Sequence, residues 1–152
     1  TGTSKDAARR EVARALGADF CIDVQQEDPL ARVMELTGGK GVDTAIEAVG
    51  IPATFEICQS IIAPGGHIAN VGVHGKSVPL HLETLWSRNI TITTRLVDTV
   101  TTPLLLKTVQ SKKLEPLQLI THRFQLGEII KAYDTFQHAD KEQALKVILT
   151  NS

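Results

Sequence analysis

Histidine and cysteine side chains are the first candidates for chemistry in this chain, because they are common ligands of transition metals. The sequence contains two cysteines, Cys21 and Cys58, and five histidines, which are His67, His74, His81, His122 and His138. No two histidines have HxxxH or HxH spacing, the cysteines do not form a CxxC pair, and neither cysteine lies close to a histidine. The spacing therefore predicts no metal ligand and no catalytic residue among them.

Carboxylates that transfer protons are the second class of candidate. Asp43 and Glu47 lie in one apolar run, but neither has a partner that is evident from the sequence. Both positions fit the ends of a strand, so we predict structural roles for them. His74 lies in a turn, and we expect it to be structural or solvated. Cys21 and Cys58 are expected to be reduced, buried thiols.

Apolar runs that end at glycines are the features that could place a ligand. Val42–Ala48 is followed by Val49-Gly50, and His67–Val71 is followed by Gly72-Val73, with the helical segment Pro52–Ile62 between the two runs. This order is typical of parallel α/β sheets, which bind ligands in a crevice outside the carboxyl ends of their strands. The first run alternates incompletely, so we expect it to be buried on both faces near its end.

The remaining segments continue this alternation. Helices are predicted for Asp6–Leu16, Leu30–Thr37, Pro103–Gln110 and Leu126–Phe136, and strands for Ala18–Val24, Ile90–Thr94, Leu119–Phe124 and Ala144–Leu149. Alternation up to residue 97 predicts parallel strands that are joined by right-handed crossovers. The rhythm changes after that point, which indicates that the tail belongs to a second layer or to a neighbouring domain.

Composition excludes several classes of protein. The chain has 152 residues and a formal net charge of -1, which is a size that suits a domain with a real core. No basic surface for nucleic acid is indicated, and no apolar stretch approaches the roughly 20 residues that span a bilayer. Without a signal or transit peptide at the start, the sequence indicates a cytoplasmic protein.

One expected part of a nucleotide-binding sheet is missing. Such a sheet begins with a strand, a glycine-rich turn and a helix that together hold the pyrophosphate of the ligand. No GxGxxG motif occurs, and Thr1-Gly2-Thr3 stands where the second strand would be ending. Without the central first strand, the runs Ala18–Val24 and Val42–Ala48 would expose apolar strand edges. We therefore predict that the chain is a fragment of a longer protein.

Several longer motifs follow one another in the order found in the medium-chain, zinc-type alcohol dehydrogenase family, and the chain resembles that family. They are Arg9, Leu16–Asp19, Thr37–Asp43, Ile46–Gly50, Pro64–Gly66, Asn70–Val73, Ile120–Phe124 and Ala144–Leu149. The likeness covers nearly the whole chain. It implies a partial doubly wound, Rossmann-like parallel sheet that lacks its first strand and glycine-rich turn. Residues 1–97 would be an incomplete dinucleotide-binding domain, and residues 98–152 would pack on it and contribute to the catalytic domain.

The resemblance also implies contacts with a nicotinamide cofactor. The nicotinamide and its ribose would lie between two strand ends, formed by Ala48, Val49, Gly50, Val71, Gly72 and Val73. The backbone of Gly72 is expected to approach the cofactor closely. Thr93 and Arg95 match the segment whose backbone meets the carboxamide, Lys146 matches a position that reaches the pyrophosphate, and Arg9 matches one beside the adenosine ribose.

Ser4 stands where members that prefer NAD carry an acid, which accepts hydrogen bonds from the ribose hydroxyls and repels a 2′-phosphate. A hydroxyl with Lys5, Arg9 and Arg10 nearby would favour NADP. An alignment shift of two positions would instead place Asp6 at the position of the acid. The expected cofactor is therefore NADP or NAD, with NADP favoured.

The function implied by the resemblance is hydride transfer between a secondary alcohol, or its ketone, and NAD(P). Zinc is expected in the complete enzyme, with its ligands upstream of this chain, so the chain alone should be inactive. A homodimer or homotetramer is expected, with the strand Ile90–Thr94 at a subunit contact. Two alternatives remain open, namely a zinc-independent, quinone-oxidoreductase-like reductase of the same superfamily and a non-catalytic nucleotide-binding or interaction domain. A methyltransferase-type sheet fits the closing strand poorly.

Overall fold

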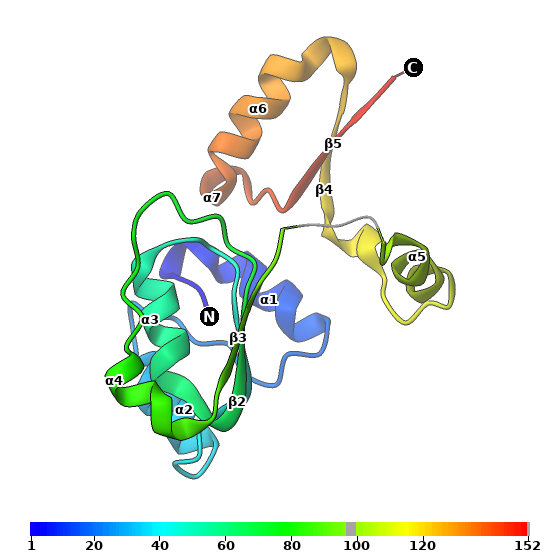
Figure 1. The fold of residues 1–152 in the computed structure, drawn as a ribbon. Coiled ribbons are helices and arrows are strands. Elements are labelled where there is room, and N and C mark those ends of the chain that lie inside the picture. Colours follow the sequence, from blue (N-terminus) through cyan, green and yellow to red (C-terminus); the bar gives the residue numbers. More distant parts are fainter. Residues whose placement is uncertain (97–99, 152) are drawn as a thin grey trace. The chain divides into compact units, whose positions relative to one another are not determined.

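The computed structural model describes residues 1–96 and 100–151. Its internal contacts form two compact units, one made of Thr1–Asp23 with Asp98–Ser152 and the other of Val24–Val97. Each unit contains its own parallel sheet (Figure 1). Residues 1–23 thus group with the C-terminal part of the chain, and the division into domains of residues 1–97 and 98–152 stays a prediction.

The sheet of the second unit is three-stranded, in the order β1 (Val42–Glu47), β2 (Ile62–Asn70) and β3 (Thr91–Thr94). β2 pairs in parallel with both neighbours, which confirms the parallel arrangement expected from the alternating pattern. Glu47 pairs with Asn70, which pairs with Thr94, so the carboxyl ends of all three strands lie at one edge of the sheet.

Helices α2 (Pro29–Leu36) and α3 (Pro52–Ile61) connect these strands, and α4 (Leu82–Leu85) with the 3-10 turn η2 (Trp86–Arg88) precedes β3. α2 begins because the side chain of Asp28 accepts hydrogen bonds from the backbone N–H groups of Leu30 and Ala31. α3 packs against β1 and β2, and α2 packs against α3. α3 therefore covers one face of the sheet.

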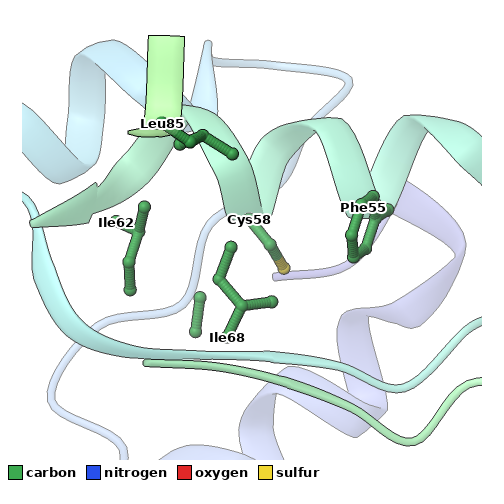
Figure 2. Packing of buried hydrophobic residues seen from close by; sticks show 6 residues of the cluster. Phe55, Cys58, Ile62, Ile68 and Leu85 are labelled. Carbon is green, nitrogen blue, oxygen red and sulfur yellow. The ribbon is translucent and has the colours of Figure 1, made fainter. Parts of the chain in front are cut away.

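The core of this unit lies between α3 and the sheet. It consists of Ala45, Phe55, Cys58, Ile62, Ile68 and Leu85. Figure 2 shows Phe55 and Cys58 projecting from the helix toward Ile62 and Ile68, with Leu85 nearby. Burying aliphatic side chains of this size stabilises a fold by about 1.5–3 kcal/mol each. The predicted burial of Cys58 is confirmed, whereas Cys21 is only half-buried.

β2 begins at Ile62, earlier than expected, so Pro64-Gly65-Gly66 lies inside the strand. The register explains this difference, because Val42 pairs with Ile62 while Thr44 already pairs with His67. The extra residues of β2 form an irregularity in the ladder, where missing hydrogen bonds make proline and glycine tolerable. Pro64-Gly65-Gly66, which precedes the predicted strand His67–Val71, is thus part of β2.

β1 is buried on one face only, which corrects the expectation of burial on both faces. Ala45 and Glu47 are buried, whereas Ile46 between them is 66% exposed. Successive side chains of a strand point to opposite faces, and α3 covers the face of Ala45 and Glu47. The incomplete alternation in the sequence therefore arose from an exposed isoleucine.

The other unit contains the two-stranded parallel sheet of β4 (Ile120–Gln125) and β5 (Lys146–Thr150), against which α6 (Ile129–Gln137) packs. Its remaining helices are α1 (Ala7–Ala15), α5 (Thr102–Gln110) and α7 (Ala139–Glu142), with the 3-10 turns η1 (Ser4–Asp6), η3 (Pro116–Leu119) and η4 (Leu126–Glu128). A guanidinium N–H of Arg9 donates to the carbonyl of Ala144 at 3.2 Å. This bond joins the two parts of the unit.

The predicted strand Ala18–Val24 does not form. Asp23 makes an isolated parallel bridge with Gly2, and Gly2 N donates to the carbonyl of Ile22 at 2.9 Å. A strand needs a paired partner along its length, and among the described residues the pairing of this segment is limited to that bridge.

Several large apolar side chains are exposed, among them Trp86, which is 76% exposed in η2. No helix in residues 1–96 and 100–151 is long and apolar enough to cross a membrane.

Candidate functional site

A buried carboxylate lies at the carboxyl edge of the three-stranded sheet. Glu47, the last residue of β1, is 1% exposed. Its Oε1 accepts hydrogen bonds from Val49 N and Gly50 N, both at 2.9 Å, and from the hydroxyl of Thr54 at 2.6 Å. One carboxylate oxygen therefore closes the turn between β1 and α3 and holds the first turn of that helix.

The same residue also holds the chain that follows β2. The carbonyl of Glu47 accepts hydrogen bonds from Val71 N at 2.8 Å and from Gly72 N at 3.1 Å. Its Oε2 lies 3.2 Å from His74 Nε2, which lies 2.8 Å from Asn70 Oδ1. The amide of Asn70 in turn donates to the carbonyl of Gly72 at 3.3 Å. The two turns at the edge of the sheet are thus joined through Glu47.

The carboxylate is charged at neutral pH in spite of its burial. Burial raises the pKa of Glu47, but hydrogen bonds from Thr54, Gly50 and Val49, together with the charge of His74, outweigh burial and lower the pKa below its usual value. Cys58 responds in the opposite way, because burial, and then the negative charge of Glu47, raise the pKa of its thiol.

Gly50 and Gly72 let the two turns pack backbone against backbone. A Cβ on Gly72 would overlap Glu47 Oε2 and the backbone nitrogen of Gly50. Gly50 has a φ of 84°, in the left-handed region, and a Cβ there would overlap the carbonyl of Val73. Gly72 therefore approaches the protein itself closely, which alone is sufficient to require glycine at this position. Its close approach to a cofactor stays a prediction.

Exposed apolar side chains lie on the two turns that Glu47 holds. Val49, Val71 and Val73 are all exposed, with Val73 at 80%, and Ala48 is exposed beside them. Asn70 accepts a hydrogen bond from Arg95 N at 3.3 Å, just beyond β3. The structure thus brings together Ala48, Val49, Gly50, Val71, Gly72, Val73, Thr93 and Arg95 at the carboxyl end of one sheet.

Thr93 lies one residue inside that edge. It pairs with Ala69 in the ladder, and its Oγ1 lies 2.7 Å from Nε2 of His67 on the neighbouring strand. His67 thus has a structural partner, in line with the structural or solvated role predicted for the histidines.

Ser4 and Arg9 lie together in the other unit, where they line a cavity of about 280 Å³ with Lys5, Asp140 and Gln143 among others. The hydroxyl of Ser4 donates to Asp23 Oδ2 at 2.9 Å.

Each cation near Ser4 faces an acid. Arg9 pairs with Asp6 at 3.0 Å, Arg10 with Asp23 at 3.2 Å, and Lys5 Nζ lies 3.7 Å from Asp140. The cations that were expected to attract a 2′-phosphate are therefore balanced by carboxylates.

Lys146 is absent from the lining of the cavity beside Ser4 and Arg9. It is the first residue of β5 and lines a different cavity, of about 310 Å³, whose other walls are mainly apolar. Tyr133 and Phe136 of α6 with Val147 and Leu149 of β5 contribute most of that lining. Its predicted contact with a cofactor pyrophosphate stays a prediction.

Within residues 1–96 and 100–151, no group of three or more His, Cys, Asp or Glu side chains is placed to hold a metal ion.

Sequence reasoning missed the partners of Glu47. The carboxylate bonds to Thr54 and lies beside His74, and neither pairing follows from a short motif. A usable signal was the period of two residues along each strand, which places Glu47 on the face of Ala45 and Asn70 on the face of Ile68. Both are polar residues on a buried face at a strand end, and such residues need partners.

The family model described as zinc-binding dehydrogenase matches residues 1–111, which is most of the chain. The chain belongs to the zinc-binding dehydrogenase family. The predicted resemblance is thereby confirmed, as is the α/β fold with parallel strands.

Curated relatives of this zinc-binding dehydrogenase chain include an alcohol dehydrogenase from Cupriavidus necator. It is 33% identical over an alignment of 148 positions, which covers 93% of this chain and 39% of the relative. A sorbitol dehydrogenase from Halalkalibacterium halodurans is 30% identical over 153 residues, covering 99% of this chain and 43% of the relative. The chain thus spans about two-fifths of the length of the curated relatives that it matches.

Solved structures of alcohol dehydrogenases are also similar to this chain. The apo form of zinc dependent alcohol dehydrogenase 2 from Streptococcus pneumonia is 48% identical, with a TM-score of 0.90, over 99% of this chain and 43% of that one. Alcohol dehydrogenase TADH from Thermus sp. ATN1 is 32% identical, with a TM-score of 0.87, over 95% of this chain and 41% of that one.

Proposed function

We propose that this chain supplies part of the cofactor site of a zinc-type alcohol dehydrogenase, which transfers a hydride between a secondary alcohol and NAD(P). The observation that carries the proposal is the edge of the three-stranded sheet, where Glu47 fixes two neighbouring turns. Ligands of doubly wound sheets bind outside the carboxyl ends of their strands. The named relatives, which are alcohol and sorbitol dehydrogenases, supply the reaction class.

The exposed residues at this edge fit a nicotinamide. Val49, Val71 and Val73 present apolar surface that would cover one face of the ring and exclude water from it. The backbone beyond β3, near Arg95, would meet the carboxamide. When bound, the cofactor accepts or donates the hydride, and the role of this chain is to orient the ring.

We propose, from the likeness to zinc-binding dehydrogenases, that zinc would be held by ligands outside this chain. In such enzymes zinc polarises the alcohol oxygen and lowers its pKa.

For the cofactor we propose NADP. Support comes from Ser4, which lacks the carboxylate that would repel a 2′-phosphate, and from Lys5 and Arg9, which line the same cavity. Asp6 and Asp140 offset these cations, so we expect the preference over NAD to be modest.

Exchanging Ser4 for Asp tests this proposal in the full-length protein. A second carboxylate beside Asp23 should repel the 2′-phosphate and accept hydrogen bonds from the ribose, shifting the ratio of kcat/KM toward NADH by about tenfold or more. Ser4→Thr keeps the hydroxyl and serves as the matched control. An unchanged ratio in Ser4→Asp would contradict the assignment of Ser4 to the adenosine ribose.

The decisive experiment for the function is a titration of the full-length protein with NADPH and NADH, combined with assays on secondary alcohols and zinc analysis. We expect cofactor binding, stoichiometric zinc and oxidation of secondary alcohols that a chelator abolishes. Reduction of quinones that is insensitive to the chelator would indicate the zinc-independent reductase instead. If the full-length protein bound no cofactor, the result would favour the alternative of a non-catalytic interaction domain.

We also propose that the protein is a cytoplasmic homodimer or homotetramer. β3 is the last strand in the sheet order, and Thr91, Thr93 and Thr94 on it are exposed, so its outer edge could pair with a second copy. Sedimentation velocity on the full-length protein tests this, and a monomer at micromolar concentration would contradict it.

A further inference from the structure

We propose that Glu47 is a positioning residue for the cofactor, because its buried carboxylate holds the turn after β1 and its main-chain carbonyl holds the turn after β2, so that the two turns of the cofactor edge keep one arrangement. The inference rests on the proposed function. It assigns Glu47 no contact with the cofactor or with the reacting atoms. Glu47 acts instead through Val49-Gly50 and Val71-Gly72-Val73, whose exposed side chains face outward from the sheet edge.

Four backbone amides of the two turns donate to Glu47. Oε1 of Glu47 accepts from Val49 N and Gly50 N, so it sets the path of the turn after β1. The carbonyl of Glu47 accepts from Val71 N and Gly72 N, so it sets the path of the chain after β2. Few backbone ladder bonds are left at the ends of strands, so these bonds replace them.

The negative charge of the Glu47 carboxylate strengthens the bonds to its side chain. Three donors point at Oε1, and such a convergence is most favourable for an ionised acceptor. The carboxylate also lies at the first turn of α3, where the partial positive charge of the helix end adds to the attraction. A neutral group of the same shape would keep the packing but lose part of this hold.

His74 faces the second oxygen of Glu47. The amide of Asn70 donates through Nδ2 to Gly72, so its Oδ1 accepts from His74 and Nε2 of His74 carries a hydrogen. That hydrogen is directed at Asn70, and Glu47 Oε2, which lies 3.2 Å from the same nitrogen, is buried without a hydrogen-bond partner of its own. The NH₂ group of a glutamine would place a second donor against the N–H of His74. Replacing Glu47 by Gln therefore sets two donors against each other inside the site.

The remaining group near the carboxylate argues for a structural hold and against proton transfer. Besides His74, Cys58 of α3 is a titratable group that interacts with Glu47. Burial and the charge of Glu47 raise the pKa of its thiol, so it stays neutral. The carboxylate is not exposed to solvent, and its Oε1 is already occupied by three donors. These features suit a fixed anchor.

The test compares Glu47→Gln with Glu56→Gln in the full-length protein. Glu56 is an exposed residue of α3, so the same substitution there is a matched control. We expect Glu47→Gln to raise the Kd for NADPH and the KM for the cofactor by about tenfold or more, because small misplacements of binding groups are costly. Its kcat should stay within about twofold of wild type, since the reacting groups are untouched.

A second measurement reports the positions of the turns directly. Hydrogen exchange at the amides of Val49 and Gly50, which donate to the side chain of Glu47, should become faster in Glu47→Gln, while exchange in β4 and β5 stays unchanged. Thr54→Val removes only the hydroxyl donor and should give a smaller rise in Kd in the same direction. This variant keeps the inference testable if Glu47→Gln fails to fold.

The outcomes separate the two proposals. If wild type binds neither NADPH nor NADH, the proposed function is overturned and the positioning role falls with it. If wild type binds cofactor but Glu47→Gln and Thr54→Val have the Kd of Glu56→Gln, only the positioning role is overturned. Faster exchange at the amides of Val49 and Gly50 with an unchanged Kd would also overturn it, because the turn after β1 would then move without consequence for the cofactor. A raised Kd with faster exchange supports both.

Discussion

At the scale of single residues, Glu47 shows how a buried charge can be kept. Isolated burial of a carboxylate is strongly unfavourable, and the group normally becomes protonated unless hydrogen bonds replace its water shell. Here two backbone amides and one hydroxyl do so, with His74 beside the second oxygen. The consequence is a lowered pKa, which connects the fold of the sheet edge to pH.

Acid should weaken the fold through Glu47. Its pKa in the folded protein lies below the usual value of 4.5, so its contribution to stability is fully present above that value and is lost as the pH falls through the lower, folded-state pKa. We expect the difference in free energy of unfolding between wild type and Glu47→Gln to be largest near neutral pH. Urea denaturation of both, at a series of pH values down to about 3, checks this. A difference that does not change with pH would contradict it.

A methyl group on Gly72 should destabilise the protein. The added Cβ would overlap Glu47 Oε2 and Gly50 N, so the two turns would have to separate, at a cost of about 1–3 kcal/mol. Gly75, three residues on, has nothing within 4 Å of a built Cβ, so Gly75→Ala should change stability by less than about 0.5 kcal/mol. Thermal unfolding of both variants gives the comparison, and equal midpoints would refute the close packing.

The sequence was sufficient to predict the exposed residues at the strand ends, but not the buried contacts of Glu47 beneath them. Glycine-terminated runs were enough to place Val49, Gly50, Val71 and Gly72 at strand ends, because turn chemistry is local. The pairing of Glu47 with His74 depends on which strands are neighbours and in what register. That information is spread over the whole sheet, so no single motif contains it.

At the scale of elements, helix starts and parallel strands were predictable, because capping residues and periodicity act within a few residues. β1, β2 and β3 formed where the apolar runs lie, and α2 begins after Asp28 with Pro29 in its first turn. The strand Ala18–Val24 failed for a non-local reason, since a β-strand is stable only beside a partner. The bulge in β2 likewise depends on its register with β1.

Removing the cap of α2 should lower stability by about 1 kcal/mol. In Asp28→Ala the amides of Leu30 and Ala31 lose their acceptor, whereas Asp28→Ser retains a side-chain oxygen that can accept. Circular dichroism during urea denaturation should give the order wild type, then Ser, then Ala, from most to least stable. A fully stable Ala variant would show that water replaces the cap without cost at this exposed site.

At the scale of the whole molecule, each compact unit contains one of the two cysteines. Cys21 is half-buried, and its Sγ donates to the carbonyl of Arg10 at 3.4 Å, whereas Cys58 lies in the apolar core of the other unit. Because the two thiols differ in burial, they provide one chemical label for the opening of each unit.

Thiol labelling should therefore be strongly biphasic. Cys21 should react first, while burial and the raised pKa of Cys58 keep its thiolate scarce, so that it reacts only when α3 separates from the sheet. A thiol reagent added to wild type, Cys21→Ser and Cys58→Ser, with mass spectrometry over time, assigns the two phases. Equal rates for the two sites would show that the core of the Val24–Val97 unit opens freely.

Trp86 gives the molecule an optical property that its chemistry does not require. It is the chain's one tryptophan, and its indole lies mostly in solvent on the turn that leads into β3. An indole surrounded by water emits at longer wavelength than one in an apolar setting. Its emission maximum should therefore move toward the blue when another surface covers η2, while events confined to the core between α3 and the sheet leave the colour of the emission unchanged.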